Sequence, residues 1–277
     1  MRSPVARTAP GAVARPGAPG AAASFSTVTE LPGGGATPEQ ISMLYTRYHW
    51  AGERVAGKDV LEVACGPGVG LGYLARLAGR IVGGDYDEQL MCSAQARYRS
   101  RIPLLRLDAE ALPFADAAFD VLVMFEALYY LARPEEFFRE ARRVLRAGGT
   151  LLVCLPNRDW VGFNPSPFAV RYFSPAELSD ALSAAGFAPH LFGGFPAGSE
   201  SLRDRILLTV RRAAVNMHVM PKTMKGKELV KRLLYRRLVP VPPEVHDGMA
   251  AVGDLAPIDA GAPAPAFRVL YAVGDRR

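Results

Sequence analysis

One stretch near residue 60 constrains the fold more than any other part of the chain. The apolar segment Val60–Val63 is typical of a buried strand, and after Ala64 and Cys65 glycines alternate at positions 66, 68, 70 and 72. Residues 71–78 then have the composition of a helix. A strand, a glycine-rich turn and a helix start bring backbone N–H groups and a positive dipole end to one point, and glycine lets a ligand come close. The stretch therefore predicts a nucleotide-like ligand lying across this turn.

Strand-like and helix-like segments alternate along the chain after this turn. Parallel strands connected by helices on both faces of a sheet give this alternation, so the sequence predicts an α/β fold with a doubly wound, mostly parallel sheet. The predicted strands lie at 80–84, 103–107, 119–125 and 150–155, and the predicted helices at 88–100, 134–145 and 175–185.

The composition divides the chain into four parts. Residues 1–36 are rich in Ala, Pro and Gly, so we expect a disordered tail. The core is expected over 37–198 and starts with a helix-capping pattern at Thr37. Residues 199–265 are predicted to form a helical insertion or lid that ends in a long loop from about residue 240. Residues 266–277 alternate in hydrophobicity and are predicted to return as the last strand of the core.

Composition also bears on partners and location. No uninterrupted apolar run approaches the roughly 20 residues of a membrane-spanning helix. The three cysteines are scattered and show no metal spacing, which favours reduced thiols in a cytoplasmic protein without a metal site. The net charge of +6 is concentrated partly between residues 203 and 237, where a basic face could favour an anionic substrate or peripheral membrane contact. Aromatic side chains do not interleave these charges, so no nucleic-acid partner is expected.

The glycine spacing and three acids narrow the choice of ligand. The dinucleotide pattern G-x-G-x-x-G is absent, because Leu71 or Tyr73 occupies its third glycine position. Instead, Glu62, Asp85 and Asp108 stand at or near the ends of three successive predicted strands, at the edge where open α/β sheets bind ligands. These carboxylates suit a ligand with a cationic amine, a ribose and an adenine better than they suit a pyrophosphate.

This arrangement resembles the class I S-adenosylmethionine-dependent methyltransferases, in particular their small-molecule "type 11" members. The resemblance rests on L-P-F-x-D-x-x-F-D at Leu112–Asp120, on R-V-L-x-x-G-G at Arg143–Gly149, and on the segment 172–187. It covers about residues 37–195 and the last strand. It implies a Rossmann-like, seven-stranded sheet and S-adenosylmethionine as the cofactor. One departure is Ala64, where the family usually has a glycine; alanine is expected to fit there if φ stays negative.

The resemblance implies a role for each residue that matches a family motif. Gly66, Gly68 and the following helix start would hold the methionine part of the cofactor, with Glu62 near its ammonium group. Asp85 would accept hydrogen bonds from the ribose hydroxyls, and Asp108 with the neighbouring N–H would bind the adenine. The full set expected to contact the cofactor is Glu62, Ala64, Cys65, Gly66, Gly68, Asp85, Tyr86, Asp108, Ala109 and Phe125.

The implied reaction is in-line displacement of the sulfonium methyl group, for which the enzyme mainly supplies alignment. Glu126, after the strand at 119–125, is the first candidate to contact or deprotonate the acceptor, and Tyr130 is the second. His49, on the helix before the glycine turn, could reach the opening of the same acceptor site. Two simpler interpretations stay open: Glu126 could cap the next segment or pair with an arginine, and His49 could serve only in packing.

The acceptor is expected to be a small molecule, which could be anionic and linked to a sugar or a lipid. The loop at 157–165 would line its site, with Trp160 and Phe163 as apolar walls and with Asn157 and Asn164 orienting polar groups. Two other functions stay open: a non-catalytic S-adenosylmethionine-binding regulator or partner subunit, and an NAD(P)-dependent oxidoreductase. The atom that is methylated and the oligomeric state cannot be inferred from the sequence.

Overall fold

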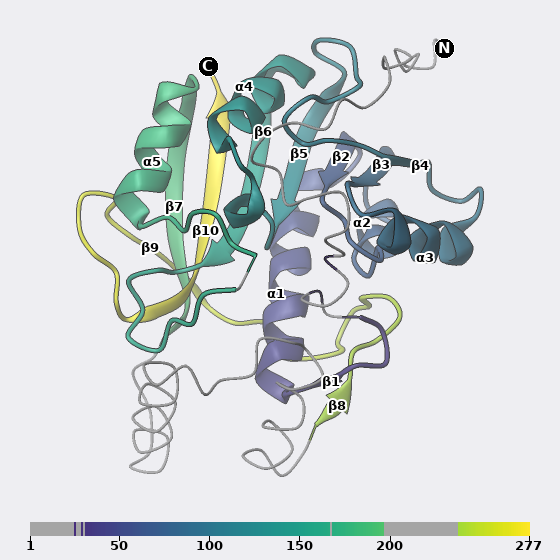
Figure 1. Ribbon diagram of the computed structural model, residues 1–277, viewed down its shortest axis with the longest axis horizontal. Helices are drawn as coiled ribbons and strands as arrows, with labels where there is room; N and C mark the ends of the chain where they lie inside the picture. Colours follow the sequence, from purple (N-terminus) through teal and green to yellow (C-terminus); the bar gives the residue numbers. More distant parts are fainter. Residues whose placement is uncertain (1–24, 26–28, 30, 167, 197–237) are drawn as a thin grey trace.

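The computed structural model describes Phe25, Thr29 and residues 31–166, 168–196 and 238–277 (Figure 1). An eight-stranded sheet forms its centre. Along the sheet the strands are β4 (Leu104–Arg106), β3 (Arg80–Asp85), β2 (Asp59–Val63), β5 (Phe119–Phe125), β6 (Leu145–Pro156), β10 (Phe267–Arg276), β7 (Phe187–Pro196) and β9 (Leu255–Pro257).

The first seven of these strands confirm the predicted doubly wound, mostly parallel sheet. β4, β3, β2, β5 and β6 pair in parallel, whereas β10 pairs antiparallel with both β6 and β7. The last strand therefore inserts between two earlier ones, and its first residue, Phe267, pairs with Pro196 at the end of β7. The eighth strand, β9, lies in a segment predicted to be a loop; it forms because Leu255–Pro257 pairs with the exposed edge of β7.

Helices cover both faces of the sheet (Figure 1). One buried apolar cluster joins one face to α1 (Pro38–Val55), α2 (Leu71–Ala75) and α3 (Glu88–Tyr98). A second cluster joins the other face to α4 (Pro134–Val144) and α5 (Pro175–Ala184). The predicted cap of α1 is confirmed: the Thr37 hydroxyl accepts from the Gln40 N–H, and the Gln40 side chain accepts from the Thr37 N–H.

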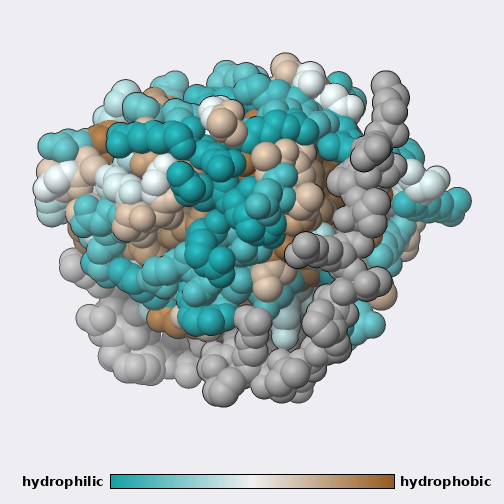
Figure 2. Space-filling view, turned by 90° about the horizontal axis from the view of Figure 1, so that it is seen from above, coloured by the Kyte–Doolittle hydropathy of each residue, from teal (hydrophilic) through white to brown (hydrophobic). Residues whose placement is uncertain are grey.

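Charged side chains close the end of the sheet where the parallel strands begin. Arg146 forms ion pairs with Asp120 at 2.7 Å and with Asp59 at 2.8 Å, and Arg80 also pairs with Asp59. Figure 2 views the molecule from this end, and the described surface there is mostly hydrophilic. The opposite end, where the parallel strands finish, carries the three acids that the sequence singles out.

The expected tail at 1–36 is wrong for its last residues. Leu31–Ala36 are ordered, and β1 (Gly35–Ala36) pairs antiparallel with β8 (Val239–Pro240). Gly33 and Val241 add another hydrogen bond, and Ala36 is buried in the core. These residues are ordered because a segment distant in sequence supplies the backbone partners that the tail composition lacks. Most of the predicted tail, and the predicted basic helices of residues 199–237, lie outside the described residues.

The described part of the 199–265 region packs closely on the core. Val241 and Val245 are buried in the cluster that contains α1 and α2, and the Val245 N–H donates to the Val69 carbonyl. This contact places the segment beside the glycine-rich turn. No helix among the described residues is long and apolar enough to cross a membrane.

Tyr98 of α3 supports the glycine-rich turn through two hydrogen bonds to its backbone. Its buried hydroxyl donates to the Gly68 carbonyl at 2.6 Å and accepts from the Gly72 N–H at 3.1 Å. We expect Tyr98→Phe to lower the free energy of unfolding by about 1–3 kcal/mol, because two buried backbone groups lose their partner. Urea denaturation checks this, with Tyr86→Phe as the control, since that ring is 44% exposed. Equal losses in the two variants would contradict the proposed support.

Candidate functional site

The loop between β2 and α2 has a left-handed backbone at three positions. Ala64 has a φ of 58°, Gly66 of 57° and Gly68 of 78°. The negative φ that would let alanine fit without strain at position 64 is therefore not present: Ala64 adopts the left-handed conformation, at a cost of about 1–2 kcal/mol. A Cβ at Gly68 would also come within 2.9 Å of the Tyr98 ring, so that position needs glycine for packing as well.

Glu62 is a buried carboxylate next to this loop. Its side chain is 1% exposed, and Oε1 accepts a 2.7 Å hydrogen bond from the Tyr48 hydroxyl of α1. Oε2 is buried too and has no hydrogen-bond partner within the described part of the chain. Burial raises the pKa of Glu62 to about 7, against the opposing effects of Tyr48 and the nearby Arg47. A buried, half-satisfied carboxylate of this kind favours a cationic ligand group.

Tyr48 of α1 is a site residue that the sequence pattern does not single out. Its ring lies where a Cβ of Gly70 would be, with 1.8 Å between the built Cβ and the nearest ring carbon. Glycine at position 70 is therefore required for the ring to reach Glu62. The sequence signal was present but ambiguous, because an extra glycine in a glycine-rich turn does not show which side chain needs the space.

Asp85 ends β3 and joins the loop to the next helix. Its Oδ2 accepts from the Gly66 N–H and its Oδ1 from the Asp87 N–H, both at 2.8 Å. Burial raises the pKa of Asp85, while the backbone donors act in the opposite direction. Cys65 is buried between the loop and the sheet, where burial raises the pKa of its thiol. The two carboxylates, Glu62 and Asp85, thus flank the same turn from adjacent parallel strands.

The expected adenine-binding residues follow β3 and β4. Tyr86 is 44% exposed, and the Arg106 guanidinium lies 5.6 Å above its ring. Asp108 is half-buried, and its Oδ1 accepts from the Glu110 N–H at 2.9 Å. Ala109 is buried beside it. The structure therefore places an open aromatic face and a carboxylate past the ends of neighbouring strands β3 and β4.

Glu126 lies directly after β5, which ends at the buried Phe125, and has a φ of 55°. The Tyr129 hydroxyl donates to Glu126 Oε2 at 3.2 Å, and the Arg47 guanidinium lies 3.8 Å from Oε1. Pairing with an arginine, one of the two simpler interpretations, is thus present in the structure. A left-handed non-glycine residue at a strand end is a feature that clusters at functional sites.

Tyr130 lies in the short 3₁₀ helix η2 (Leu128–Tyr130) that follows Glu126. Its hydroxyl donates to Ser166 Oγ at 3.2 Å. His49 lies elsewhere: its ring contacts Tyr73 and Glu53, and the structure shows no contact between His49 and Glu62, Asp85 or Glu126 within the described residues. Successive side chains of a helix point in different directions, so His49 does not follow Tyr48 toward Glu62. It points toward Tyr73 of α2 instead.

Aromatic side chains line the region beyond Glu126. Tyr129 stacks on Tyr172 with ring centroids 4.7 Å apart, and Phe163 packs against Tyr172 at 4.6 Å. Trp160 contacts Arg268 instead. Asn157 does not orient a substrate: it is fully buried, and its amide group donates to the carbonyls of Ala264 and Phe267. The N–H groups of a buried amide need acceptors within the protein, so Asn157 is used in packing. The sequence alone does not show that this side chain is buried.

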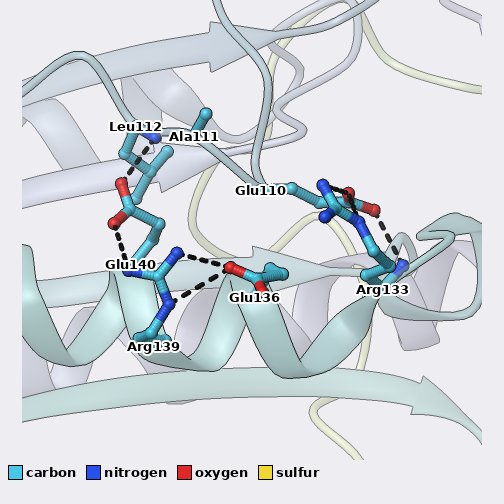
Figure 3. Close-up of a pocket in the computed structure, with 7 residues that line it drawn as sticks. All are labelled: Glu110, Ala111, Leu112, Arg133, Glu136, Arg139 and Glu140. Carbon is cyan, nitrogen blue, oxygen red and sulfur yellow. Dashed lines mark hydrogen bonds and ion pairs between the residues drawn. The ribbon is translucent and has the colours of Figure 1, made fainter. Parts of the chain in front are cut away.

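A separate surface hollow lies beside α4 (Figure 3). Its acidic and basic side chains are paired with one another or with backbone groups, as the dashed lines show. It includes neither Glu62 nor Asp85, and we assign it no ligand. The lining residues are Glu110, Ala111, Leu112, Arg133, Glu136, Arg139 and Glu140.

Comparison with known proteins shows which family part of the chain resembles. Residues 61–153 match the family described as "Methyltransferase domain". This part of the chain is therefore a methyltransferase domain. A "probable S-adenosylmethionine-dependent methyltransferase" of Mycolicibacterium smegmatis is 40% identical over 146 residues, which are 50% of this chain and 56% of that protein. The chain thus spans only about half the length of this curated relative.

Two further proteins extend the comparison of this methyltransferase domain. A phthiotriol/phenolphthiotriol dimycocerosates methyltransferase of Mycobacterium ulcerans is 39% identical over 110 residues, which cover 38% of this chain and 41% of that protein. A solved S-adenosylmethionine-dependent methyltransferase from Thermotoga maritima has a TM-score of 0.54 at 17% identity, over 86% of this chain and 92% of that chain. The second comparison shows the shared fold.

The family and fold imply S-adenosylmethionine as the cofactor, and the described residues fit this group. The unpaired Oε2 of Glu62 offers a buried acceptor for the cofactor's ammonium group. Gly66 and Gly68 carry no side chain on the loop, and Asp85 holds the loop from the neighbouring strand. These are the parts that the methionine and ribose portions of the cofactor need.

Replacing Ala64 by glycine tests the strain in the loop. We expect Ala64→Gly to raise the free energy of unfolding by about 0.5–1 kcal/mol, because relief of the left-handed alanine exceeds the extra chain entropy of glycine. The control Ala75→Gly, in helix α2, should lower it by a similar amount. Thermal and urea unfolding of both variants measure the two effects. Destabilisation by Ala64→Gly would contradict the assigned strain.

The raised pKa of Glu62 predicts a pH dependence of ligand affinity. The carboxyl group is protonated below its pKa of about 7, whereas a cationic amine prefers the ionised form. We therefore expect affinity for S-adenosylhomocysteine to fall from pH 7 to pH 5 by up to about tenfold per unit. Calorimetry at several pH values should show a much flatter profile for Glu62→Gln. An equal slope in both proteins would assign the titration to another group.

Proposed function

We propose that this protein transfers the methyl group of S-adenosylmethionine to a small-molecule acceptor. The observation that carries the proposal is the pair of buried carboxylates, Glu62 and Asp85, on either side of the left-handed loop. The missing third fingerprint glycine argues against a dinucleotide, and therefore against the oxidoreductase alternative.

Each part of the cofactor has a proposed partner. Glu62 would receive the ammonium group, and Arg47, which lies between Glu62 and Glu126, would face the carboxylate. Asp85 would accept from the ribose hydroxyls, and Asp108 with the Ala109 N–H would bind the adenine next to the Tyr86 ring. When bound, S-adenosylmethionine supplies a methyl group on a positively charged sulfur.

Glu126 is the proposed proton acceptor for an acceptor molecule with a hydroxyl or a protonated amine. The Tyr129 hydroxyl orients its carboxylate, and Arg47 balances its charge. Tyr130 would form part of the acceptor wall. His49 is not part of the proposed site, because its ring lies beside Tyr73 of α2. Alignment of the acceptor against this carboxylate is the main catalytic contribution expected from the chain.

The aromatic lining favours an apolar acceptor, such as a lipid-linked molecule or one that carries a ring. The relative from Mycobacterium ulcerans that is named as a dimycocerosates methyltransferase supports this choice. The anionic or sugar-linked character predicted from the basic residues, and membrane contact through them, depend on residues 203–237, which lie outside the described residues. A cytoplasmic location likewise stays a prediction.

Two measurements test the proposed function. Calorimetry should show that the protein binds S-adenosylmethionine and S-adenosylhomocysteine in preference to NAD. Incubation with methyl-labelled S-adenosylmethionine and fractionated lipid and small-molecule extracts, followed by mass spectrometry, should then reveal a labelled product. Binding without transfer to any fraction would favour the regulator alternative, and preferential binding of NAD would overturn the proposal.

Asp85→Asn tests the ribose contact with little change of shape. The variant keeps one oxygen for a backbone donor but loses the negative charge and one acceptor. We expect its affinity for S-adenosylhomocysteine to fall about tenfold, equivalent to about 1.4 kcal/mol, because charge-assisted hydrogen bonds are lost. Circular dichroism must show an unchanged fold. Wild-type affinity in the variant would sink the ribose assignment.

A further inference from the structure

Two residues of the N-terminal region lie over the cofactor loop although they are about 40 positions away from it in sequence. The Phe25 N–H donates to Asp87 Oδ2 at 2.7 Å. A Cβ built on Gly66 would be 3.6 Å from the Thr29 methyl group. The N–H and hydroxyl of Thr29 both donate to the Phe25 carbonyl, at 2.9 and 2.8 Å. Phe25 and Thr29 therefore form one unit, which we call the latch.

Asp87 anchors the latch with one oxygen and a helix with the other. Oδ1 accepts from the N–H groups of Gln89 and Leu90 and so caps α3, while Oδ2 accepts from Phe25. The Asp87 N–H in turn donates to Asp85 Oδ1. The latch is thus connected to the proposed ribose carboxylate through a single residue, and Asp87 is buried.

The Phe25 ring extends from this anchor to the acceptor side of the site. It packs against Tyr130 with ring centroids 5.2 Å apart, and edge-on against Phe168 at 6.2 Å. Tyr130 follows β5, and Phe168 lies in the loop that follows β6. Phe25 therefore links Asp87, through its backbone N–H, to the aromatic wall beyond Glu126, through its ring.

We propose that the latch closes over the bound cofactor and that Phe25 completes the aromatic wall of the acceptor site. This inference rests on the proposed function. Thr29 covers the loop at Gly66, so a ligand that lies along the loop is enclosed by it. The hydrogen bond to Asp87 fixes the latch, and the contacts of the Phe25 ring position it on the acceptor side. The latch slows cofactor release by covering the ligand, not by changing the loop.

Asp87→Asn separates the latch from the helix cap. Asparagine is among the best capping residues, so one oxygen still caps α3. The other oxygen becomes an amide group, which cannot accept from the Phe25 N–H. Phe25→Ala removes the ring and leaves both Asp87 and α3 unchanged. Ser174→Asn, which changes the cap of α5 in a comparable way away from the loop, is the matched control.

The probe is S-adenosylhomocysteine, with affinity measured by calorimetry and release by stopped-flow displacement in the full-length protein. We expect Asp87→Asn and Phe25→Ala each to weaken binding about tenfold, mainly through faster release. The double variant should be little weaker than either single one, because both changes release the same latch. Ser174→Asn should match the wild type. Hydrogen exchange of the peptide containing Phe25 should slow when the ligand binds.

The outcomes separate this inference from the proposed function. Tight binding by the wild type with the same release rate in Phe25→Ala overturns the latch and leaves the methyltransferase proposal standing. Unchanged exchange of the Phe25 peptide on ligand binding also overturns the latch. Failure of the wild type to bind S-adenosylhomocysteine overturns the proposed function, and the latch falls with it. Because Phe25→Ala does not alter α3, weakened binding in that variant cannot come from a damaged helix cap.

Discussion

Burial of the Glu62 carboxylate at the end of β2 is the constraint on which the site depends. An ionised group in this position needs partners, and the described residues supply one hydroxyl and leave one oxygen unpaired. The Tyr48 hydroxyl can reach Glu62 only because position 70 is glycine. The loop adopts its conformation only through left-handed residues, one of which is an alanine. The sequence thus tolerates strain and incomplete hydrogen bonding at the same point. Both features have a physical reason if a cationic ligand completes the site.

Much of the fold follows from local patterns in the sequence. Apolar strands, helix caps and the alternation between them are short-range features, so the mostly parallel sheet and the N-terminal cap of α1 agree with prediction. The ordering of residues 31–36 and the strand β9 could not be predicted in this way, because both depend on backbone partners far away in the chain. Capping signals act within one turn, whereas strand pairing of short segments depends on the whole fold.

In the candidate site, as in the fold, local sequence patterns predict some features and not others. The acids at the strand ends could be predicted, since parallel strands must finish at a common edge. The positive φ of Ala64 could not, because composition does not show which residue of a turn is left-handed. His49 and Tyr48 are neighbours in sequence but point in directions about 100° apart on the helix, so choosing between them required coordinates. Asn157 looked like a substrate contact because nothing local reveals that an amide will be buried.

The pairing of Phe267 with Pro196 has a consequence for how this fold can vary. The chain leaves the sheet at the end of β7 and re-enters it for its last long strand at the start of β10, where Phe267 is paired with Pro196 at the edge that carries the candidate site. The described part of the connection is fixed at β8, at β9 and at the buried Val241 and Val245, but the stretches between these points can change in length at little entropic cost, because closing a longer loop costs only slightly more. New residues inserted there would emerge beside the acceptor region without disturbing strand register. The antiparallel last strand therefore gives the domain a place where specificity can diverge while the cofactor machinery stays the same.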